Sequence, residues 1–372
     1  MNFLSKAKQS AIKNKTCILR AGFDIQNKNE TLRLEATLPT LNLLLKNDAK
    51  IIIIAHRGRP KKTYSLGKKV KANKDETLAV TLPYFKKNLK TQITLVSDFN
   101  LKTLKEKIKK SKPKTIFLLE NIRLIKGEEK ADPKLGKALS ELGDFYINDD
   151  FAAAHRSNSS ITEIPKHIPS YAGLLLEAEI NALRRATSKP KKPFVVIVGG
   201  AKVPEKISVV GKLLPTAQTF LIGGIVATTF LKAKNLDIGK SKFDKEMIQA
   251  AQTLEKSKKI ILPADYVVHN DEIQDIGPGA IKIFSTEIKK ASTILWNGPM
   301  GHFEDKRFRK GSEMIARAIA KSKAFSLIGG GETTELIREL KLQKKVGFLS
   351  TGGGAMLTYL GGGAMPALEA LG

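Results

Sequence analysis

The feature that most limits how this chain can fold is a regular alternation of short aliphatic runs with amphipathic stretches. The runs are rich in β-branched residues and predict strands at 16–19, 51–54, 93–96, 115–119, 145–147, 194–198, 219–222, 260–262, 293–296, 325–328 and 346–349. Between them, helical periodicity is clearest at 76–89, 133–142, 244–254 and 309–320. Strands that are apolar along their whole length and separated by helices form parallel sheets covered on both faces. The sequence therefore predicts an α/β fold of doubly wound, Rossmann-like parallel sheets.

The length of 372 residues predicts two lobes, because it exceeds what one ordinary hydrophobic core holds. The alternation breaks at 149–170, a polar stretch that contains Pro165 and Pro169. A helix is predicted at 171–186 and ends in a stop signal with Pro190. We expect residues 171–189 to form a helix and hinge between a first lobe of residues 1–170 and a second lobe of residues 190–355.

The formal net charge of +28 favours anionic partners such as phosphorylated metabolites or nucleotides. Many lysines alternate with Ile and Leu, as at 101–114, which is typical of solvated helix faces. The basic stretch 61–74 has one aromatic residue, Tyr64, and lacks the stacking pattern of a single-strand binder, so nucleic acid is not expected as the main partner. No apolar run is long enough to span a membrane. Cys17 is the only cysteine, which excludes an intrachain disulfide and predicts a cytoplasmic location.

Cationic side chains follow the predicted strands of the first half. Ligands of doubly wound sheets bind beyond the carboxyl ends of the strands. In the first half those positions hold Arg20, His56, Arg59, Arg123, His155 and Arg156. The planar guanidinium of arginine binds a carboxylate or phosphate through two N–H groups. A surface ion pair is the simpler explanation for any one of them, but the set at equivalent positions predicts a site for a small anion with several charges.

Glycine-rich turns follow the predicted strands of the second half, although no Walker loop or dinucleotide fingerprint is present. The turn at 199–206 contains Lys202 and Lys206, four residues apart on one helix face. Two more glycine turns lie at 329–331 and 352–354, each before a helix. Amide groups at helix N-termini bind anions. Tight packing explains one such turn, but three in one lobe predict a site for nucleotide phosphates, with Glu304 as an acceptor for ribose hydroxyls.

In order along the chain, these segments resemble the phosphoglycerate kinase family over nearly the whole sequence. The blocks that carry the resemblance are Arg33 within 31–38, then 56–60, 119–123, 148–156, 199–206, 275–278, 296–304, 329–333 and 350–355. The most specific are the WNGPMG, GGAKV and STGGGA segments. The resemblance implies reversible phosphoryl transfer between 1,3-bisphosphoglycerate and ADP, giving 3-phosphoglycerate and ATP, with Mg²⁺, in glycolysis or gluconeogenesis. It also implies a monomer, lobe closure, and a return of residues 356–372 to the first lobe.

The resemblance also implies roles for individual residues. Residues expected to bind the acid substrate are Asp24, Arg33, His56, Arg59, Arg123 and Arg156. Residues expected to bind the nucleotide are Gly200, Lys202, Lys206, Asn297, Glu304, Gly329, Gly330, Gly331 and Thr333. The expected catalytic residues are Arg33, Lys206, Gly330 and Gly353, and Arg33 and Lys206 would stabilise the transferring phosphoryl group. Glu332 is expected to help hold the metal ion.

The sequence departs from the family pattern in the first substrate loop. That loop usually reads R-x-D-x-N-x-P, and here Gly22 stands at the Asp position, Asp24 at the Asn position and Gln26 at the Pro position. Two outcomes are open: Asp24 supplies a carboxylate from two residues away, or its charge repels the anionic substrate. Glu332 likewise replaces the usual Asp. These changes leave an alternative function, a kinase-like paralogue that binds nucleotide or nucleic acid without useful turnover.

Overall fold

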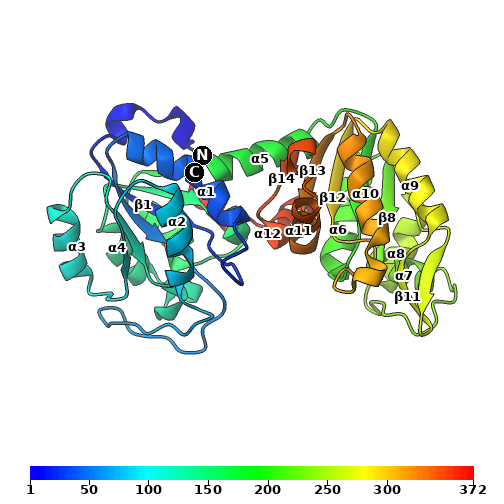
Figure 1. Cartoon of the computed structure of the whole chain (residues 1–372), viewed down its shortest axis with the longest axis horizontal. Helices are drawn as coiled ribbons and strands as arrows, with labels where there is room; N and C mark the ends of the chain where they lie inside the picture. Colours follow the sequence, from blue (N-terminus) through cyan, green and yellow to red (C-terminus); the bar gives the residue numbers. More distant parts are fainter. The chain divides into compact units, whose positions relative to one another are not determined.

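The computed structural model describes all residues from Met1 to Gly372 and divides into two compact units (Figure 1). The first unit comprises Met1–Glu179 and Met365–Gly372, and the second comprises Ile180–Ala364. The division falls inside helix α5 (Leu174–Thr187). No helix is long and apolar enough to cross a membrane.

The first unit contains a six-stranded sheet in the order β3-β4-β2-β1-β5-β6, in which every pair of neighbours is parallel. Its strands are β1 (Thr16–Ala21), β2 (Lys50–Ile54), β3 (Ile93–Val96), β4 (Ile116–Leu119), β5 (Phe145–Asp149) and β6 (Ser170–Ala172). The helices are α1 (Leu32–Lys46), α2 (Leu82–Asn88), α3 (Leu101–Lys110), α4 (Pro133–Ser140) and the C-terminal α13 (Pro366–Ala370).

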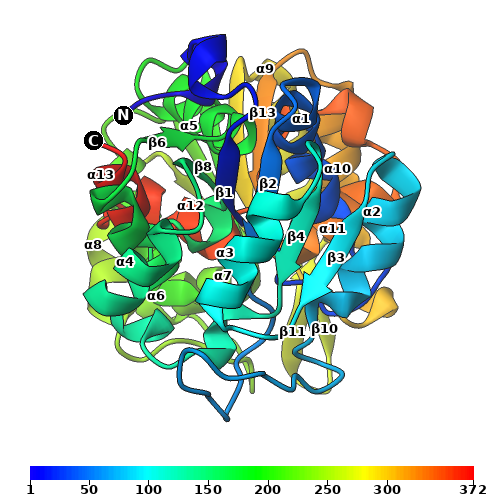
Figure 2. The same ribbon diagram turned by 90° about the vertical axis from the view of Figure 1, so that its left-hand side faces the viewer.

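The core of the first unit follows from side chains that alternate between the two faces of the sheet. Leu19, Ile53 and Leu118 belong to a buried cluster that also contains Leu41 of α1 and Phe85 of α2. Successive residues point to the opposite face, on which α3 and α4 lie in front of the sheet (Figure 2). Both faces are therefore covered, as a parallel sheet of continuous apolar strands requires.

The second unit contains another parallel six-stranded sheet, in the order β14-β13-β12-β7-β8-β9. Its strands are β7 (Phe194–Val198), β8 (Thr219–Ile222), β9 (Ile260–Ile261), β12 (Thr293–Asn297), β13 (Phe325–Gly329) and β14 (Phe348–Leu349). A separate antiparallel hairpin joins β10 (Tyr266–His269) to β11 (Glu272–Ile276). The predicted fold class, parallel α/β sheets in two lobes, is thus confirmed.

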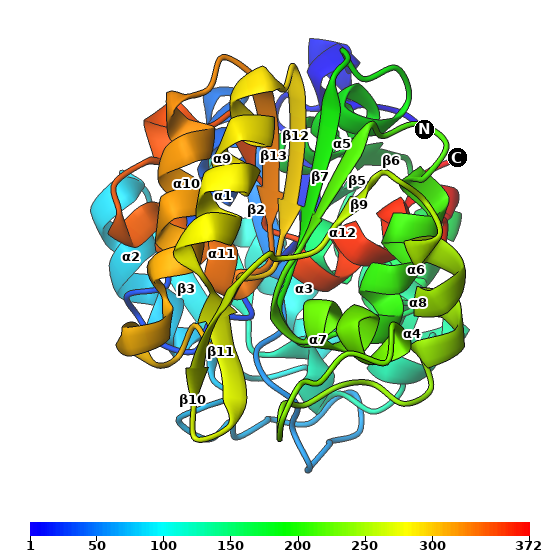
Figure 3. The same ribbon diagram turned by 90° about the vertical axis from the view of Figure 1, so that its right-hand side faces the viewer.

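Two helical layers cover the second sheet (Figure 3). One layer contains α9 (Pro278–Lys290), α10 (Lys310–Lys321) and α11 (Gly331–Glu339). Their apolar faces share a buried cluster with β-strand residues such as Ile197, Trp296 and Ile328. The other layer contains α6 (Val203–Leu213), α7 (Gly224–Ala233), α8 (Ile248–Glu255) and α12 (Gly353–Leu360).

Each sheet has one point where its connections leave in opposite directions. In the first sheet β1 and β5 are neighbours, but the chain continues from β1 to β2 on one side and from β5 to β6 on the other. In the second sheet β7 and β12 are neighbours, and their connections also diverge, to β8 and to β13. Loops after such strands form a crevice in which α/β proteins bind ligands. We therefore expect ligand-binding sites at the loops after β1, β5, β7 and β12.

Three features of the fold differ from the expectations. The strand β6 and the hairpin β10–β11 lie where no strand was expected, and α5 begins at Leu174 because residues 170–172 pair with β5. The C-terminal return to the first unit begins at Met365 rather than at residue 356. The reason is that α12 packs against α6 and belongs to the second unit.

Candidate active site

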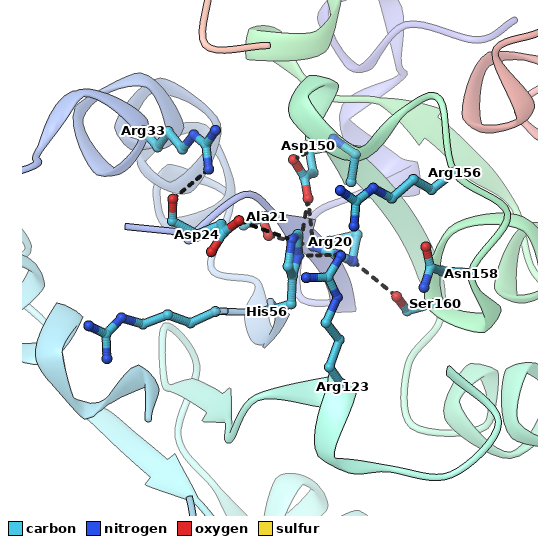
Figure 4. Close-up of polar contacts among 12 residues, drawn as sticks. Arg20, Ala21, Asp24, Arg33, His56, Arg123, Asp150, Arg156, Asn158 and Ser160 are labelled. Atoms are coloured by element: carbon cyan, nitrogen blue, oxygen red, sulfur yellow. Dashed lines mark hydrogen bonds and ion pairs between the residues drawn. The ribbon is translucent and has the colours of Figure 1, made fainter. Parts of the chain in front are cut away.

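In the first unit, four arginines surround one buried histidine at the carboxyl edge of the sheet (Figure 4). Arg20 ends β1, Arg33 lies in the first turn of α1, and Arg123 and Arg156 follow β4 and β5. We call Arg20, Arg33, Arg123 and Arg156 the arginine cluster. The histidine is His56, which follows β2 and is 4% exposed. The strand-end positions identified in the sequence are thus brought together, as the parallel topology requires.

Burial, together with the charges of the arginine cluster, favours the neutral form of His56. Burial, and then the charges of Arg20, Arg123, Arg156 and Arg33, lower the pKa of His56 well below its usual value. Nη2 of Arg20 lies 2.8 Å from Nδ1 of His56, and because a guanidinium only donates, Nδ1 is the acceptor. The ring proton of neutral His56 is therefore on Nε2.

Arg20 is fixed inside the first unit rather than free to bind a ligand. Its Nη1 donates to the Ala21 carbonyl at 2.6 Å and to Oδ2 of Asp150 at 2.8 Å, and its Nε donates to Oγ of Ser160 at 2.9 Å. Only 1% of Arg20 is exposed. Ser160 in turn donates to the buried Glu128 at 2.6 Å. Arg20 therefore holds His56 from the buried side of the site.

The other arginines are held less completely. Nη1 of Arg33, a half-buried side chain, donates to the Asp24 carbonyl at 2.5 Å. Nη1 of Arg123 donates to the Gly58 carbonyl at 2.7 Å, and its Nε forms an ion pair with the exposed Glu129 at 3.3 Å. Each retains N–H groups beyond those contacts, because a guanidinium has five.

Arg156 and Arg59 complete the cationic residues that the sequence assigned to this unit. Nε of Arg156, a half-buried side chain, donates to Nε2 of His155 at 3.4 Å. Arg59 is exposed on the loop after β2. The buried and half-buried part of this candidate site therefore consists of the arginine cluster and His56, and Arg59 belongs to its exposed part.

Asp24, the residue whose effect the sequence left open, points toward His56. Its Oδ1 accepts from the Gly58 amide at 2.8 Å, and its Oδ2 lies 3.9 Å from Nε2 of His56. The side chain is 42% exposed, so it lies at the rim of the site. Arg33 donates to the backbone carbonyl of Asp24, and the charge of Asp24 acts on Arg123, so two arginines of the cluster lie near this carboxylate.

In the second unit, Lys206 lies between two glycine turns. Its ammonium group donates to the Gly199 carbonyl after β7, and only 4% of the residue is exposed. Gly200 and Gly298 both have positive φ, at +73° and +87°. A Cβ on Gly200 would lie 2.8 Å from Nζ of Lys206, and one on Gly298 would lie 2.7 Å from it. Only glycine therefore fits on either side of this lysine.

The pKa of Lys206 is lowered to about 8, chiefly by burial and in smaller part by the nearby charge of Lys202, although the charge of Glu332 acts in the opposite direction. Lys202 itself is exposed, at the N-cap of α6. An anion beside Lys206 would restore its full charge, because an opposite charge favours the ionised form. The second unit thus holds a buried ammonium group without a carboxylate hydrogen-bonded to it.

The turn after β13 meets the turn after β12. Asn297 ends β12, and its side-chain Nδ2 is buried without a hydrogen-bond partner. A Cβ on Gly330 would lie 3.6 Å from that Nδ2, and a Cβ on Gly353 would lie 3.7 Å from the Cα of Gly330. Oγ1 of Thr333 donates back to the Gly329 carbonyl at 2.5 Å. An orphaned buried donor needs an explanation, and here it lies beside converging glycine turns.

Four helices of the second unit begin beside these turns without a side-chain cap. They are α6, α7, α11 and α12, and the residues before them are Lys202, Gly223, Gly330 and Gly352. The uncapped amides are available to an anion.

A cavity of about 280 Å³ opens beside the glycine turns of the second unit. Its lining includes Gly200, Gly224, Tyr266, Pro299 and Met300, together with the carboxylate-bearing residues Glu304 and Glu332. This volume is near the lower end for small-molecule sites, about 300–1,000 Å³. Four polar residues expected at the nucleotide site do not line the cavity. Asn297 ends β12, Lys202 is at the N-cap of α6, Lys206 lies in α6 and Thr333 lies in α11, all next to the glycine turns.

The charge of Glu304 acts on Glu332. Burial raises the pKa of Glu332, and the charge of Glu304 raises it further. No group of three or more His, Cys, Asp or Glu side chains suited to a metal ion is present in the chain. A divalent ion here would therefore need ligands from a bound substrate as well.

Comparison with known proteins decides the family. A family model described as "PGK: Phosphoglycerate kinase" matches residues 7–363. This chain belongs to the phosphoglycerate kinase family. Phosphoglycerate kinase of Finegoldia magna is 37% identical to it, over 97% of each chain, and that of Buchnera aphidicola is 38% identical, over 99% of this chain and 97% of the relative.

Solved structures of phosphoglycerate kinases agree. The structure from Coxiella burnetii has a TM-score of 0.81 at 32% identity, and the match covers 99% of this chain and 98% of the Coxiella chain. The structure from Pyrococcus horikoshii OT3 has a TM-score of 0.85 at 30% identity, with 100% and 98% covered. The resemblance seen in the sequence is confirmed, and with it the enzyme class, a phosphotransferase with a carboxyl group as acceptor, and the reversible transfer between 1,3-bisphosphoglycerate and ADP. Nothing in these comparisons favours a binding protein without turnover.

The sequence reasoning missed Asp150, Ser160 and Glu128, which hold Arg20 in place. A signal was present in the sequence, because Asp150 directly follows the predicted strand at 145–147 and the residues Asn148 and Asp149. Polar residues at strand ends near a switch point are candidates for a site whether or not they carry a positive charge.

Proposed function

We propose that the acid substrate, 3-phosphoglycerate or 1,3-bisphosphoglycerate, binds to Arg33, Arg123 and Arg156 of the arginine cluster in the first unit. The observation that supports this most strongly is the convergence of the cluster on His56, which stays neutral. Arg33, Arg123 and Arg156 have N–H groups to donate to carboxylate or phosphate oxygens, and Nε2 of His56 can donate to a substrate oxygen. Arg59 and Asp24 contribute at the exposed edge, with Asp24 offering an acceptor for a substrate hydroxyl.

ATP or ADP binds to the second unit in this proposal. The adenosine part would occupy the cavity, with Glu304 accepting from ribose hydroxyls. The phosphates would lie on the glycine turns, where they would meet Lys202, Lys206 and the orphaned amide of Asn297. The amides of Gly329–Gly331 and Gly353, and the hydroxyl of Thr333, lie on or next to the same turns.

The chemistry requires position and positive charge more than a covalent intermediate. In the direction of ATP use, a carboxylate oxygen of 3-phosphoglycerate attacks the γ-phosphorus, and the bond from that phosphorus to the bridging oxygen of ADP breaks. No base is needed, because the attacking carboxylate is already ionised at neutral pH. Arg33 and Lys206 would neutralise charge on the transferring group, and the amides of Gly330 and Gly353 would donate to its oxygens.

Mg²⁺ fits the donor set of the second unit. Such an ion is usually held by one or two carboxylates and by substrate phosphates. Glu332 would hold it together with the nucleotide, since this residue lines the cavity and no larger ligand group is present. When bound, the ion supplies charge neutralisation between the phosphates.

The two proposed sites belong to different units, so transfer requires the units to close on each other, which would also exclude water. A monomer in the cytoplasm, with no role in binding nucleic acid, remains the expectation for the whole protein.

The role of Arg33 separates an enzyme from a nucleotide-binding paralogue. We expect Arg33→Ala to lower kcat by about 10²-fold or more, because it removes a charge that acts on the transferring group, and to leave ATP affinity nearly unchanged. Arg317→Ala, which removes an exposed arginine from α10, is the matched control. Steady-state kinetics and calorimetric titration with ATP measure the two quantities. Equal kcat for Arg33→Ala and the unmodified protein would contradict the proposed role.

A further inference from the structure

Gly22 and Asp150 occupy equivalent places after two neighbouring strands. Gly22 follows β1 and Asp150 follows β5, and the preceding residues, Ala21 and Asp149, are partners in the parallel register. Because side chains at equivalent positions of paired strands lie side by side, the carboxylate of Asp150 competes for the space above Gly22. A Cβ on Gly22 would lie 2.5 Å from Oδ1 of Asp150 and 3.0 Å from its Cγ.

The carboxylate of Asp150 cannot move away to make room. It is 1% exposed, and both oxygens have hydrogen-bond partners. Oδ2 accepts from Nη1 of Arg20 at 2.8 Å, and Oδ1 accepts from the Ala153 amide at 3.2 Å. A separation below 3.0 Å is not found for real Cβ atoms, so a side chain at position 22 would break one of these bonds. The glycine therefore follows from the position of the Asp150 carboxylate.

Asp150 acts on the arginine cluster through a buried chain of contacts. It binds Nη1 of Arg20, and Nη2 of the same guanidinium donates to Nδ1 of His56. Oδ2 of Asp150 also lies 3.8 Å from that Nδ1. A guanidinium held at both ends has one orientation, which keeps the acceptor side of His56 occupied and its Nε2–H directed away from Arg20.

We propose that Gly22 and Asp150 are a matched pair, in which Asp150 is a positioning residue that orients Arg20 and His56 for the acid substrate and Gly22 leaves the space for its carboxylate. This inference rests on the proposed acid-substrate site. It also explains why glycine stands at position 22, where the family pattern has Asp. A carboxylate is present at this place, but it belongs to the residue after β5 instead of the residue after β1. Moving it back to β1 should then restore the site.

The experiment compares the unmodified protein with Asp150→Ala, Gly22→Asp and the double variant that carries both changes. We measure KM and kcat for 3-phosphoglycerate, calorimetric Kd values for 3-phosphoglycerate and for ATP, and the unfolding temperature. Each single variant should raise the Kd for 3-phosphoglycerate at least about tenfold, because a hydrogen bond to a charged group is lost or a second carboxylate is forced beside the first. ATP affinity should not change, since the nucleotide site is in the other unit.

The double variant carries the decisive result. It has one carboxylate again, now on residue 22, so most of the lost affinity for 3-phosphoglycerate should return. A purely structural role would lower the unfolding temperature without this recovery. Effects that simply add in the double variant, or an unchanged Kd for 3-phosphoglycerate in Asp150→Ala, would overturn the proposal.

Two further measurements separate failure of the proposed pair from failure to fold and from failure of the proposed function. If Asp150→Ala does not fold, Asp150→Asn keeps the volume and removes the charge, and it should also weaken 3-phosphoglycerate binding; an unchanged Kd in that variant overturns the proposal. The unmodified protein tests the proposed function by itself. If it binds ATP but not 3-phosphoglycerate, the acid-substrate site and this pair both fail; if it binds both ligands and only the recovery is missing, the pair alone fails.

Discussion

Lys206 is the residue whose surroundings are least like those of an ordinary lysine. It is buried between Gly200 and Gly298, donates to a carbonyl, and has a pKa lowered to about 8, chiefly by burial. Above pH 8, therefore, the free protein loses this charge in part, and a phosphate that binds beside it must recover the proton.

ATP binding at a pH slightly above 8 should consequently take up a fraction of a proton. Calorimetric titration in two buffers of different ionisation enthalpy measures this uptake. Lys206→Arg is the control, because a guanidinium keeps its charge in this range and should take up none. Equal proton uptake by the unmodified protein and by Lys206→Arg would show that the ammonium group of Lys206 is not next to the phosphates.

Single residues also mark where the sequence was informative and where it was not. His56, Arg123 and Arg156 were predicted because cations at strand ends of a parallel sheet converge, whereas Arg33, which lies in α1, was expected only from the resemblance to the family. The position of Asp150 beside Arg20 and Gly22 was not predicted, because it depends on the pairing of two strands that are far apart in the chain. Register between distant strands is a tertiary property that residue types alone do not specify.

Among the elements, the glycine turns of the second unit have backbone geometry that bears directly on the proposed binding of nucleotide phosphates. The turn at Gly298 has φ of +87°, and a Cβ there would overlap the Gly199 carbonyl and approach Nζ of Lys206. The turn therefore has no room for any side chain, whereas a glycine within a helix costs stability.

We expect Gly298→Ala to weaken ATP binding by at least about tenfold and to lower the free energy of unfolding, because it strains the left-handed backbone and displaces Lys206. Gly211→Ala is the control: Gly211 lies in α6, the helix that carries Lys206, and its Cβ would meet only Leu254 at 3.9 Å. It should bind ATP normally and gain about 0.5–1 kcal/mol of stability. Calorimetry and denaturant unfolding compare the two, and similar ATP affinities would contradict the account.

Most strands were predictable from the sequence, because buried parallel strands are continuous apolar runs, as in β7 (Phe194–Val198) and β8 (Thr219–Ile222). The hairpin β10–β11 was not, since β10 is largely exposed and β11 mixes isoleucines with polar residues, so neither strand is a continuous buried apolar run. Its turn residues, Asn270 and Asp271, both have positive φ, which is the pattern of a tight hairpin turn. The strand β6 was missed because its three residues form an edge strand only through pairing with β5.

For the whole molecule, the net charge of +28 should assist the capture of anionic substrates. We expect kcat/KM for 3-phosphoglycerate to fall several-fold as chloride raises the ionic strength from about 0.02 to about 0.2 M, because the Debye length falls to below about 10 Å. Added sucrose, which changes the solution without changing ionic strength, serves as the control. A kcat/KM that does not depend on chloride would show that the charge acts elsewhere.

The two-lobe organisation followed from chain length and from the break in alternation, but the exact course of the C-terminus did not. Residues 356–364 stay with the second unit because α12 packs on α6, and the chain reaches the first unit only from Met365. The unit to which residues 356–364 belong depends on packing between helices that are distant in the sequence, and a local sequence pattern does not predict such packing.

The central claim is that the first unit binds the acid substrate, the second binds the nucleotide, and together they transfer a phosphoryl group. Steady-state formation of ATP from 1,3-bisphosphoglycerate and Mg-ADP by the purified protein tests it most directly. We expect clear turnover that saturates with both substrates, which would also show that Gly22 and Asp24 are compatible with catalysis. A folded sample that binds ATP but forms none from these substrates would contradict the claim.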